Sequence, residues 1–137
     1  MLWTRPFLAM ILAAAPVAAA DSQRPTGEAA LQKALAGRVQ VGEPVSCILL
    51  LPTARGGSVI PGTAVIYNSG GRMYVNRPRT GAEDLTDDVI LVSRTPTNQL
   101  CRDTTVDLVD RFSRISRGFL QLGDFVPYAR PRNGRAR

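Results

Sequence analysis

The sequence predicts a mainly β fold, a small antiparallel barrel or sandwich of five to six strands with one short N-terminal helix. From Val39 onward, short runs rich in β-branched and aromatic residues alternate with Pro, Gly and Asn. No long helical segment separates these runs, and parallel strands would need one as a crossover. The 137 residues of the chain suffice for one domain and are too few for two ordinary ones.

Residues 1–20 are typical of a secretory signal peptide. Arg5 precedes the apolar segment 6–15, and Ala18 and Ala20 give the small-residue pattern of a cleavage site. The apolar segment is shorter than the about 20 residues that a membrane-spanning helix needs. The sequence therefore predicts cleavage, a periplasmic or secreted location, and no transmembrane anchor in the mature protein.

Residues 21–38 predict a linker and a short helix. Thr26 is the expected N-cap and Gly37 the expected stop. Leu31 and Leu35 lie one turn apart and give the helix a narrow apolar face. Because so short a helix is marginal alone, we expect it to pack on the rest of the protein.

Residues 39–128 predict a single β domain. Its clearest hairpin turns at Asn68–Gly71, where Asn and Gly tolerate the positive φ angles of a tight reversal. The segment 88–94 is apolar at its centre, which suits a strand covered on both faces. Pro127 is expected to stop the ladder of the last strand. The predicted strands come from the runs VSCILLL, SVIPGTAVIY, RMYV, DVILVSR, TVDLVDR and GFLQLGDFVPY.

The chain has two cysteines and no histidine. An exported protein is exposed to an oxidising compartment in which a cysteine pair persists as a disulfide. We therefore expect a Cys47–Cys101 disulfide rather than a metal site or a catalytic thiol.

The formal net charge is +6, and much of the excess lies in residues 129–137. This basic segment is expected to be a disordered tail, because it has little apolar surface to bury. It favours attraction to an anionic envelope component. The alternative is a solvated tail that keeps the protein dispersed. Few aromatics accompany the basic residues, so no nucleic-acid partner is expected.

The inventory of catalytic groups is poor, and the sequence predicts no catalytic residue, no cofactor and no metal site. Without histidine, Ser-His-Asp triads and histidine-based zinc sites are excluded. Carboxylate chemistry by Asp107, Asp110 and Asp124 remains as an alternative. Strand alternation, however, already explains Asp107 and Asp110 as solvent-facing. A calcium site is a further alternative, but the spacing does not follow an EF-hand loop in the acidic group Glu83, Asp84, Asp87 and Asp88.

The residues with the best case for ligand binding lie around the end of the strand RMYV. Alternation places Tyr74 and Asn76 together on one face, exposed beside Arg77 and Arg79. Two guanidinium groups on a proline-stiffened segment can grip a phosphate or carboxylate. They can equally pair with the acidic group that follows, in which case the segment is a scaffold. The sequence leaves both interpretations open and favours the scaffold.

The same runs together resemble a family of uncharacterised small exported proteins of Gram-negative bacteria. The resemblance covers about Val45 to Tyr128. It rests on a cysteine in the first strand, a glycine-turn hairpin ending in Tyr-x-Asn, Leu-Cys before an Asp-containing strand, and a closing Leu-Gly-x-Phe. The resemblance implies export, a compact β-rich domain and a disulfide, and it transfers no catalytic residue.

The leading functional hypothesis is an exported, non-enzymatic module that binds an anionic envelope component or another exported protein. It rests on the poor catalytic inventory and the basic excess. Two alternatives remain open: a small carboxylate-dependent hydrolase, and a secreted enzyme inhibitor that presents a disulfide-held loop.

Overall fold

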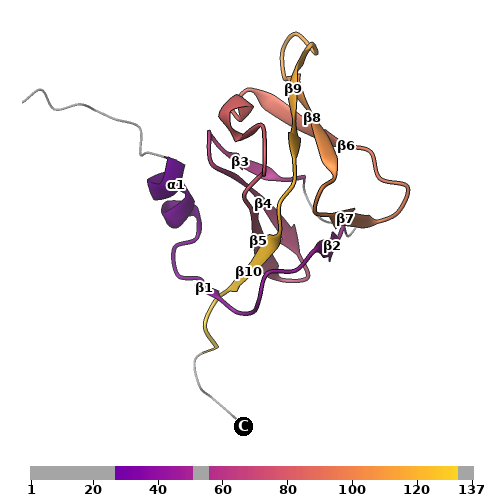
Figure 1. Cartoon of the computed structure of the whole chain (residues 1–137). Coiled ribbons are helices and arrows are strands. Elements are labelled where there is room, and N and C mark those ends of the chain that lie inside the picture. The colour runs from indigo at the N-terminus through magenta and orange to yellow at the C-terminus, as the bar shows by residue number, and fades with distance from the viewer. Residues whose placement is uncertain (1–26, 51–55, 133–137) are drawn as a thin grey trace, which may run out of the picture.

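The computed structural model describes residues 27–50 and 56–132, which form one α-helix, one short 3-10 helix and ten strands (Figure 1). The predicted signal peptide, the predicted N-cap Thr26 and residues 133–137 of the predicted tail lie outside the described residues. The helices are α1 (Gly27–Ala34) and η1 (Ala82–Asp84). The strands are β1 (Val39–Gln40), β2 (Cys47–Leu49), β3 (Ser58–Ile60), β4 (Ala64–Ser69), β5 (Arg72–Asn76), β6 (Val89–Ser93), β7 (Gln99–Cys101), β8 (Thr105–Asp110), β9 (Ser116–Gln121) and β10 (Phe125–Ala129).

The strands form three antiparallel sheets. The largest has the order β1-β10-β5-β4-β3, a second joins β2 to β7, and a third has the order β6-β8-β9. Single bridges, Val45 to Phe125 and Thr80 to Gln121, lie outside these strand pairs. Within the described residues the three ladders do not join into one closed barrel. The prediction of a mainly β, antiparallel fold with one short helix is confirmed.

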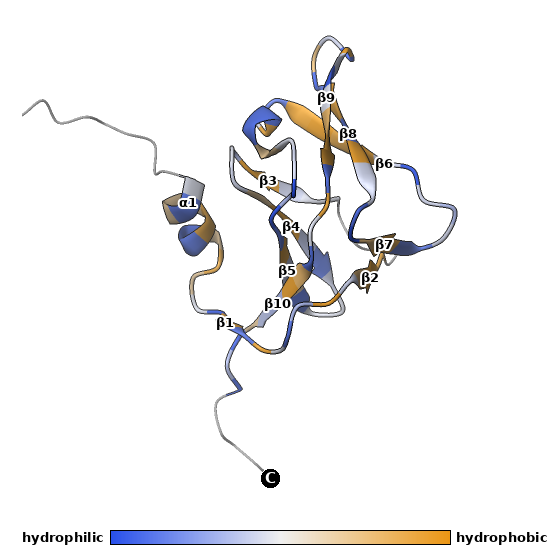
Figure 2. Ribbon diagram, in the orientation of Figure 1, coloured by the Kyte–Doolittle hydropathy of each residue, from blue (hydrophilic) through white to orange (hydrophobic). Residues whose placement is uncertain are grey.

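The main core lies between the five-stranded sheet and the two smaller sheets. It combines Val65, Tyr67 and Phe125 of the five-stranded sheet with Leu100 of β7 and Leu108 of β8, all of them buried. The rings of Tyr67 and Phe125 meet edge to face, with centroids 6.0 Å apart. Figure 2 shows the hydrophobic stretches of β8 and β10 that contribute to this core.

Helix α1 covers the other face of the five-stranded sheet. Leu31 and Leu35 are buried in a second cluster with Ile60, Ile66 and Val75. The prediction of a short helix that must pack on the rest of the protein is therefore confirmed. Strand β4 lies between the two cores, because its alternate side chains enter one or the other.

The predicted β4–β5 hairpin is confirmed. Ser69 pairs with Arg72, so Gly70 and Gly71 are the two residues of the turn. Their φ angles are 60° and 77°, the left-handed conformation that a tight hairpin turn requires and that glycine adopts without strain.

The predicted disulfide is also confirmed. Cys47 of β2 and Cys101 of β7 are directly opposite each other in an antiparallel pair, and their sulfur atoms are bonded. The bond fixes the small two-stranded sheet at a point where Cys47 is exposed.

The number of strands differs from the predicted five to six. Two predicted runs each divide into two strands, one at the turn after Ile60 and one at Gly123, which separates β9 from β10. The two-residue strand β1 and the three-residue strand β7 are additional. Such short strands carry too few residues for alternation to reveal them.

Two further expectations about strands are wrong. The segment 88–94 forms β6, an edge strand in which Ile90 and Val92 are only half-buried, because α1 packs on the five-stranded sheet instead. Pro127 does not stop the ladder, since β10 continues to Ala129. The carbonyl of Pro127 accepts a hydrogen bond from the Val41 N–H at 3.0 Å, toward the short edge strand β1. On that side the missing N–H costs little.

In the part of the chain that the structure describes, no helix combines the length and hydrophobicity needed to cross a bilayer.

Candidate anion-binding site

Asn76, predicted to be exposed, is instead completely buried. Its side-chain Nδ2 donates to the Gly123 carbonyl at 2.8 Å, and its Oδ1 accepts from the Gly123 N–H at 2.9 Å. A Cβ at Gly123 would lie 2.4 Å from the carbonyl oxygen of Arg77, so only glycine allows this approach. Alternation correctly separates Asn76 from Val75, but the side of β5 that carries Asn76 faces the β9–β10 corner rather than solvent. Asn76 is therefore a structural residue.

Arg77 and Arg79 each form an ion pair, but not with the acidic group that follows them. Arg77 forms a two-pronged pair with Glu28 of α1, in which Nη2 lies 3.1 Å from Oε2. This hydrogen bond lowers the pKa of Glu28 and raises the pKa of Arg77. Arg79 Nη1 lies 2.9 Å from Asp103 Oδ1. Both arginines pair with carboxylates of the same chain, as the scaffold interpretation expects, but the predicted partners, Glu83 to Asp88, are wrong.

The carboxylates considered for catalysis or metal binding either form ion pairs or lie apart from one another. Asp110 is nearly buried and binds Arg117, so the expectation that it faces solvent is wrong. Asp124 pairs with Arg102 at 3.4 Å. Among the described residues, no group of three or more Cys, Asp and Glu side chains is placed to hold a metal ion.

A group of basic side chains surrounds an open depression of about 680 Å³ at the end of the five-stranded sheet. Three segments meet there: the turn after α1, the Gly70–Gly71 turn, and the chain that leaves β10. They are brought together because β10 pairs with both β1 and β5. We call this site the arginine depression, after its four basic side chains: Arg38, Arg72, Arg130 and Arg132.

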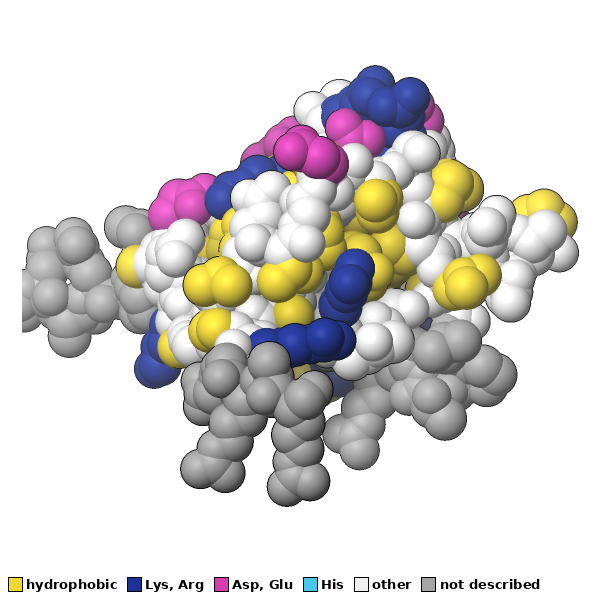
Figure 3. All heavy atoms as spheres, turned by 90° about the horizontal axis from the view of Figure 1, so that it is seen from below, with side chains coloured by type: hydrophobic (Ala, Val, Ile, Leu, Met, Phe, Trp, Pro, Cys, Tyr) yellow, Lys and Arg dark blue, Asp and Glu magenta, His cyan; other side chains and the backbone are white. Residues whose placement is uncertain are grey.

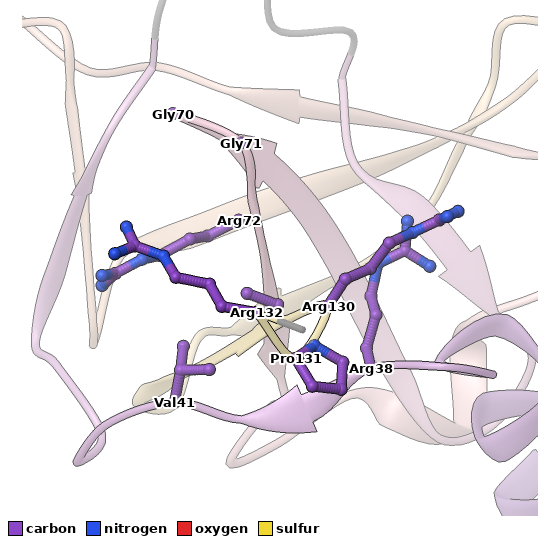
Figure 4. Close-up of a pocket in the computed structure, with 9 residues that line it drawn as sticks. Arg38, Val41, Gly70, Gly71, Arg72, Arg130, Pro131 and Arg132 are labelled. Atoms are coloured by element: carbon purple, nitrogen blue, oxygen red, sulfur yellow. The ribbon is translucent and has the colours of Figure 1, made fainter. Parts of the chain in front are cut away.

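The four guanidinium groups form two sets across the depression. In Figure 4, Arg72 and Arg132 extend toward one side, and Arg38 and Arg130 toward the other. Figure 3 shows this end of the molecule, with basic side chains among hydrophobic ones and the acidic side chains toward the opposite edge.

The arginine depression is not neutralised by the described part of the chain. No carboxylate of the described residues lies within 4.0 Å of its guanidinium groups, although four other arginines have such partners. Positive charges that line one depression repel one another, and an anion bound there reduces that repulsion. The arrangement therefore favours a phosphate or a carboxylate as ligand.

A second depression of about 500 Å³ adjoins the first. The two share Gly70 and Arg72, and the second is lined further by Leu49, Tyr74 and the disulfide cysteine Cys47. Tyr74 is half-buried and is the one predicted ligand residue that borders either depression. An apolar surface therefore continues from the basic one.

Sequence reasoning missed the arginine depression for two reasons. The sequence predicts a disordered tail that includes Arg130 and Arg132, whereas β10 extends to Ala129 and places the chain after it against the sheet. Arg72 lies 34 residues from Arg38 in sequence, and only the sheet order brings them to one site. The available signal was the density of arginine after Tyr128.

No protein-family model, no curated protein and no solved structure matches this chain.

Proposed function

We propose that the protein is an exported, non-enzymatic module that binds the anionic groups of an envelope component in the arginine depression. The observation that carries the proposal is that four arginines line one depression and have no carboxylate partner among the described residues. A guanidinium group matches the geometry of phosphate and carboxylate and stays charged at any physiological pH.

The shape of the site supports a group on a larger ligand rather than a small enclosed molecule. The depression is open, and the apolar surface beside Tyr74 continues from it. A polymer that carries anionic groups on a sugar or peptide backbone fits both properties. In the same proposal, the sheets pack as a sandwich that holds the Gly70–Gly71 turn in place, and the predicted signal peptide delivers the protein to the envelope.

The proposal is tested by retention of the oxidised mature protein on two immobilised probes. Deacylated lipopolysaccharide offers phosphates without acyl chains, and peptidoglycan offers carboxylates. We expect retention on at least one of them, weakening as salt screens the exposed charges. Retention on peptidoglycan would show that carboxylates suffice, and retention on lipopolysaccharide alone would favour its phosphates.

The Arg72→Gln variant tests the site itself. A charge-assisted hydrogen bond contributes about 1.5–3 kcal/mol, so its loss is expected to weaken binding about tenfold or more. The matched control is Arg94→Gln, which removes the same charge at an exposed position that does not line the depression and should change binding less than about twofold. Equal losses in the two variants would show non-specific attraction, and no retention on either probe would reject the proposal.

A further inference from the structure

The β8–β9 hairpin exposes large hydrophobic side chains at its tip. Its loop, Arg111–Ile115, projects at the end of the molecule opposite the described C-terminal segment (Figure 1). Phe112 is 79% exposed and Ile115 is 66% exposed, and Phe119 on β9 is 57% exposed. Singly scattered apolar residues on a surface need no explanation, but several on one hairpin mark an interaction site.

The tip is held rigidly in this conformation by Asp110. One carboxylate oxygen, Oδ1, accepts hydrogen bonds from the backbone N–H groups of Phe112 and Ser113 at 2.9 and 2.8 Å. The other, Oδ2, accepts from Arg117 Nη1 at 2.9 Å. The Asp110 N–H donates to the Ile115 carbonyl at 2.8 Å and closes the loop. The fold thus organises a loop whose apolar side chains remain in solvent.

Basic residues flank the apolar ones at regular intervals. The segment reads RFSRISRGF from Arg111 to Phe119, with an arginine at every third position from Arg111 to Arg117. Arg111 and Arg114 are exposed, and no carboxylate of the described residues lies within 4.0 Å of either. The tip therefore combines apolar surface with positive charge.

We propose that the β8–β9 tip docks on an anionic lipid surface. Phe112 and Ile115 enter the boundary between headgroups and acyl chains, where apolar side chains leave water. Arg111 and Arg114 remain at headgroup level and contact the lipid phosphates, because a basic residue near an anionic bilayer is attracted to it. Their long side chains allow the charged ends to stay in the aqueous layer.

Size and charge favour a lipid surface over a protein partner. A stable protein interface takes about 800 Å² and some 20 to 30 residues from each partner. The projecting loop Arg111–Ile115 has only five residues, far fewer than such an interface uses. A bilayer needs no complementary pocket and accepts a convex tip, and anionic headgroups complement the arginines.

The experiment measures binding of the oxidised mature protein to phosphatidylglycerol/phosphatidylethanolamine vesicles by co-sedimentation, with phosphatidylcholine vesicles as the uncharged reference. The Phe112→Ser/Ile115→Ser variant should bind the anionic vesicles at least tenfold more weakly, a change of about 1.4 kcal/mol. The matched control is Val39→Ser/Val45→Ser, which alters two exposed apolar residues outside the hairpin and outside both depressions and should stay within about twofold. The Arg111→Gln/Arg114→Gln variant should lose about fivefold per arginine on anionic vesicles at low salt and little on phosphatidylcholine.

Three results would overturn the proposal. The first is wild-type protein that fails to bind the anionic vesicles, and the second is equal binding by the serine variant of the tip and its control. The third is loss of a protein dimer, seen by gel filtration, when the tip is changed while vesicle binding is unaltered, since the tip would then be a protein interface. A urea unfolding curve for each variant verifies that it is folded under the binding conditions.

Discussion

Replacing Asn76 with alanine is the sharpest test of whether this residue is part of the scaffold. The substitution removes both partners of Gly123, whose N–H and carbonyl lie in a completely buried contact with Asn76. A buried backbone group left without a partner costs about 1–3 kcal/mol, so two such groups together cost roughly 2–6 kcal/mol. That loss is large beside the total stability of about 5–15 kcal/mol that small domains have.

The measurement is urea unfolding followed by far-ultraviolet circular dichroism, with the slope of the transition compared between variants. The control is Asn68→Ala, at an exposed position on the neighbouring strand β4, where a change within about 0.5 kcal/mol is expected. A loss below about 1 kcal/mol for Asn76→Ala would refute the reasoning. Under conditions where Asn76→Ala is folded, its retention on deacylated lipopolysaccharide or peptidoglycan should equal that of wild type. Weakened retention would show that Asn76 belongs to the binding site.

Two further predictions concern stability. Converting Cys47 and Cys101 to serine removes a cross-link between residues 54 apart, so the chain-entropy relation predicts a loss on the order of 4 kcal/mol in urea unfolding; a change below about 1 kcal/mol would contradict it. Backbone hydrogen bonds and Arg117 lower the pKa of Asp110 in the folded protein. Its carboxylate therefore stabilises the fold above the unfolded pKa, near 4, and this contribution is lost as pH falls through the lower folded pKa. In unfolding curves measured between pH 7 and pH 2, Asp110→Asn should be destabilised near neutral pH and show less of the acid-induced loss, and an unchanged pH profile would refute the assignment.

The features predicted correctly are those with short-range signals. The β4–β5 turn is encoded by Gly70 and Gly71, because the required backbone conformation is local. Helix α1 depends on Leu31 and Leu35 one turn apart. The disulfide needs no geometry at all, since the chain has one possible pair.

The failed predictions about the site depend on contacts between distant parts of the chain. Alternation in β5 indicates which residues share a face of the strand, but not which part of the chain covers that face. Asn76 is covered by the segment around Gly123, which follows 47 residues later in the sequence. Arg77 finds Glu28, 49 residues earlier, although acidic residues lie much nearer in sequence. Local charge patterns cannot identify the partner, because the fold places Glu28, and not the acidic residues nearer in sequence, beside Arg77.

The sequence predicts that the basic excess lies largely in a C-terminal tail. The structure places arginines without a described carboxylate partner both in the arginine depression and at the β8–β9 tip. The arginine depression lies where the chain leaves β10, whereas the β8–β9 tip projects at the other end of the molecule (Figure 1). One flat surface cannot contact both ends at once. If the tip enters a bilayer, the arginine depression faces away from the bilayer, where it can contact an anionic envelope polymer. Binding to vesicles and binding to peptidoglycan should then be compatible, and each should be weakened by substitutions that leave the other unchanged. Competition between the two ligands would mean that they share a site, and one of the two proposals would be wrong.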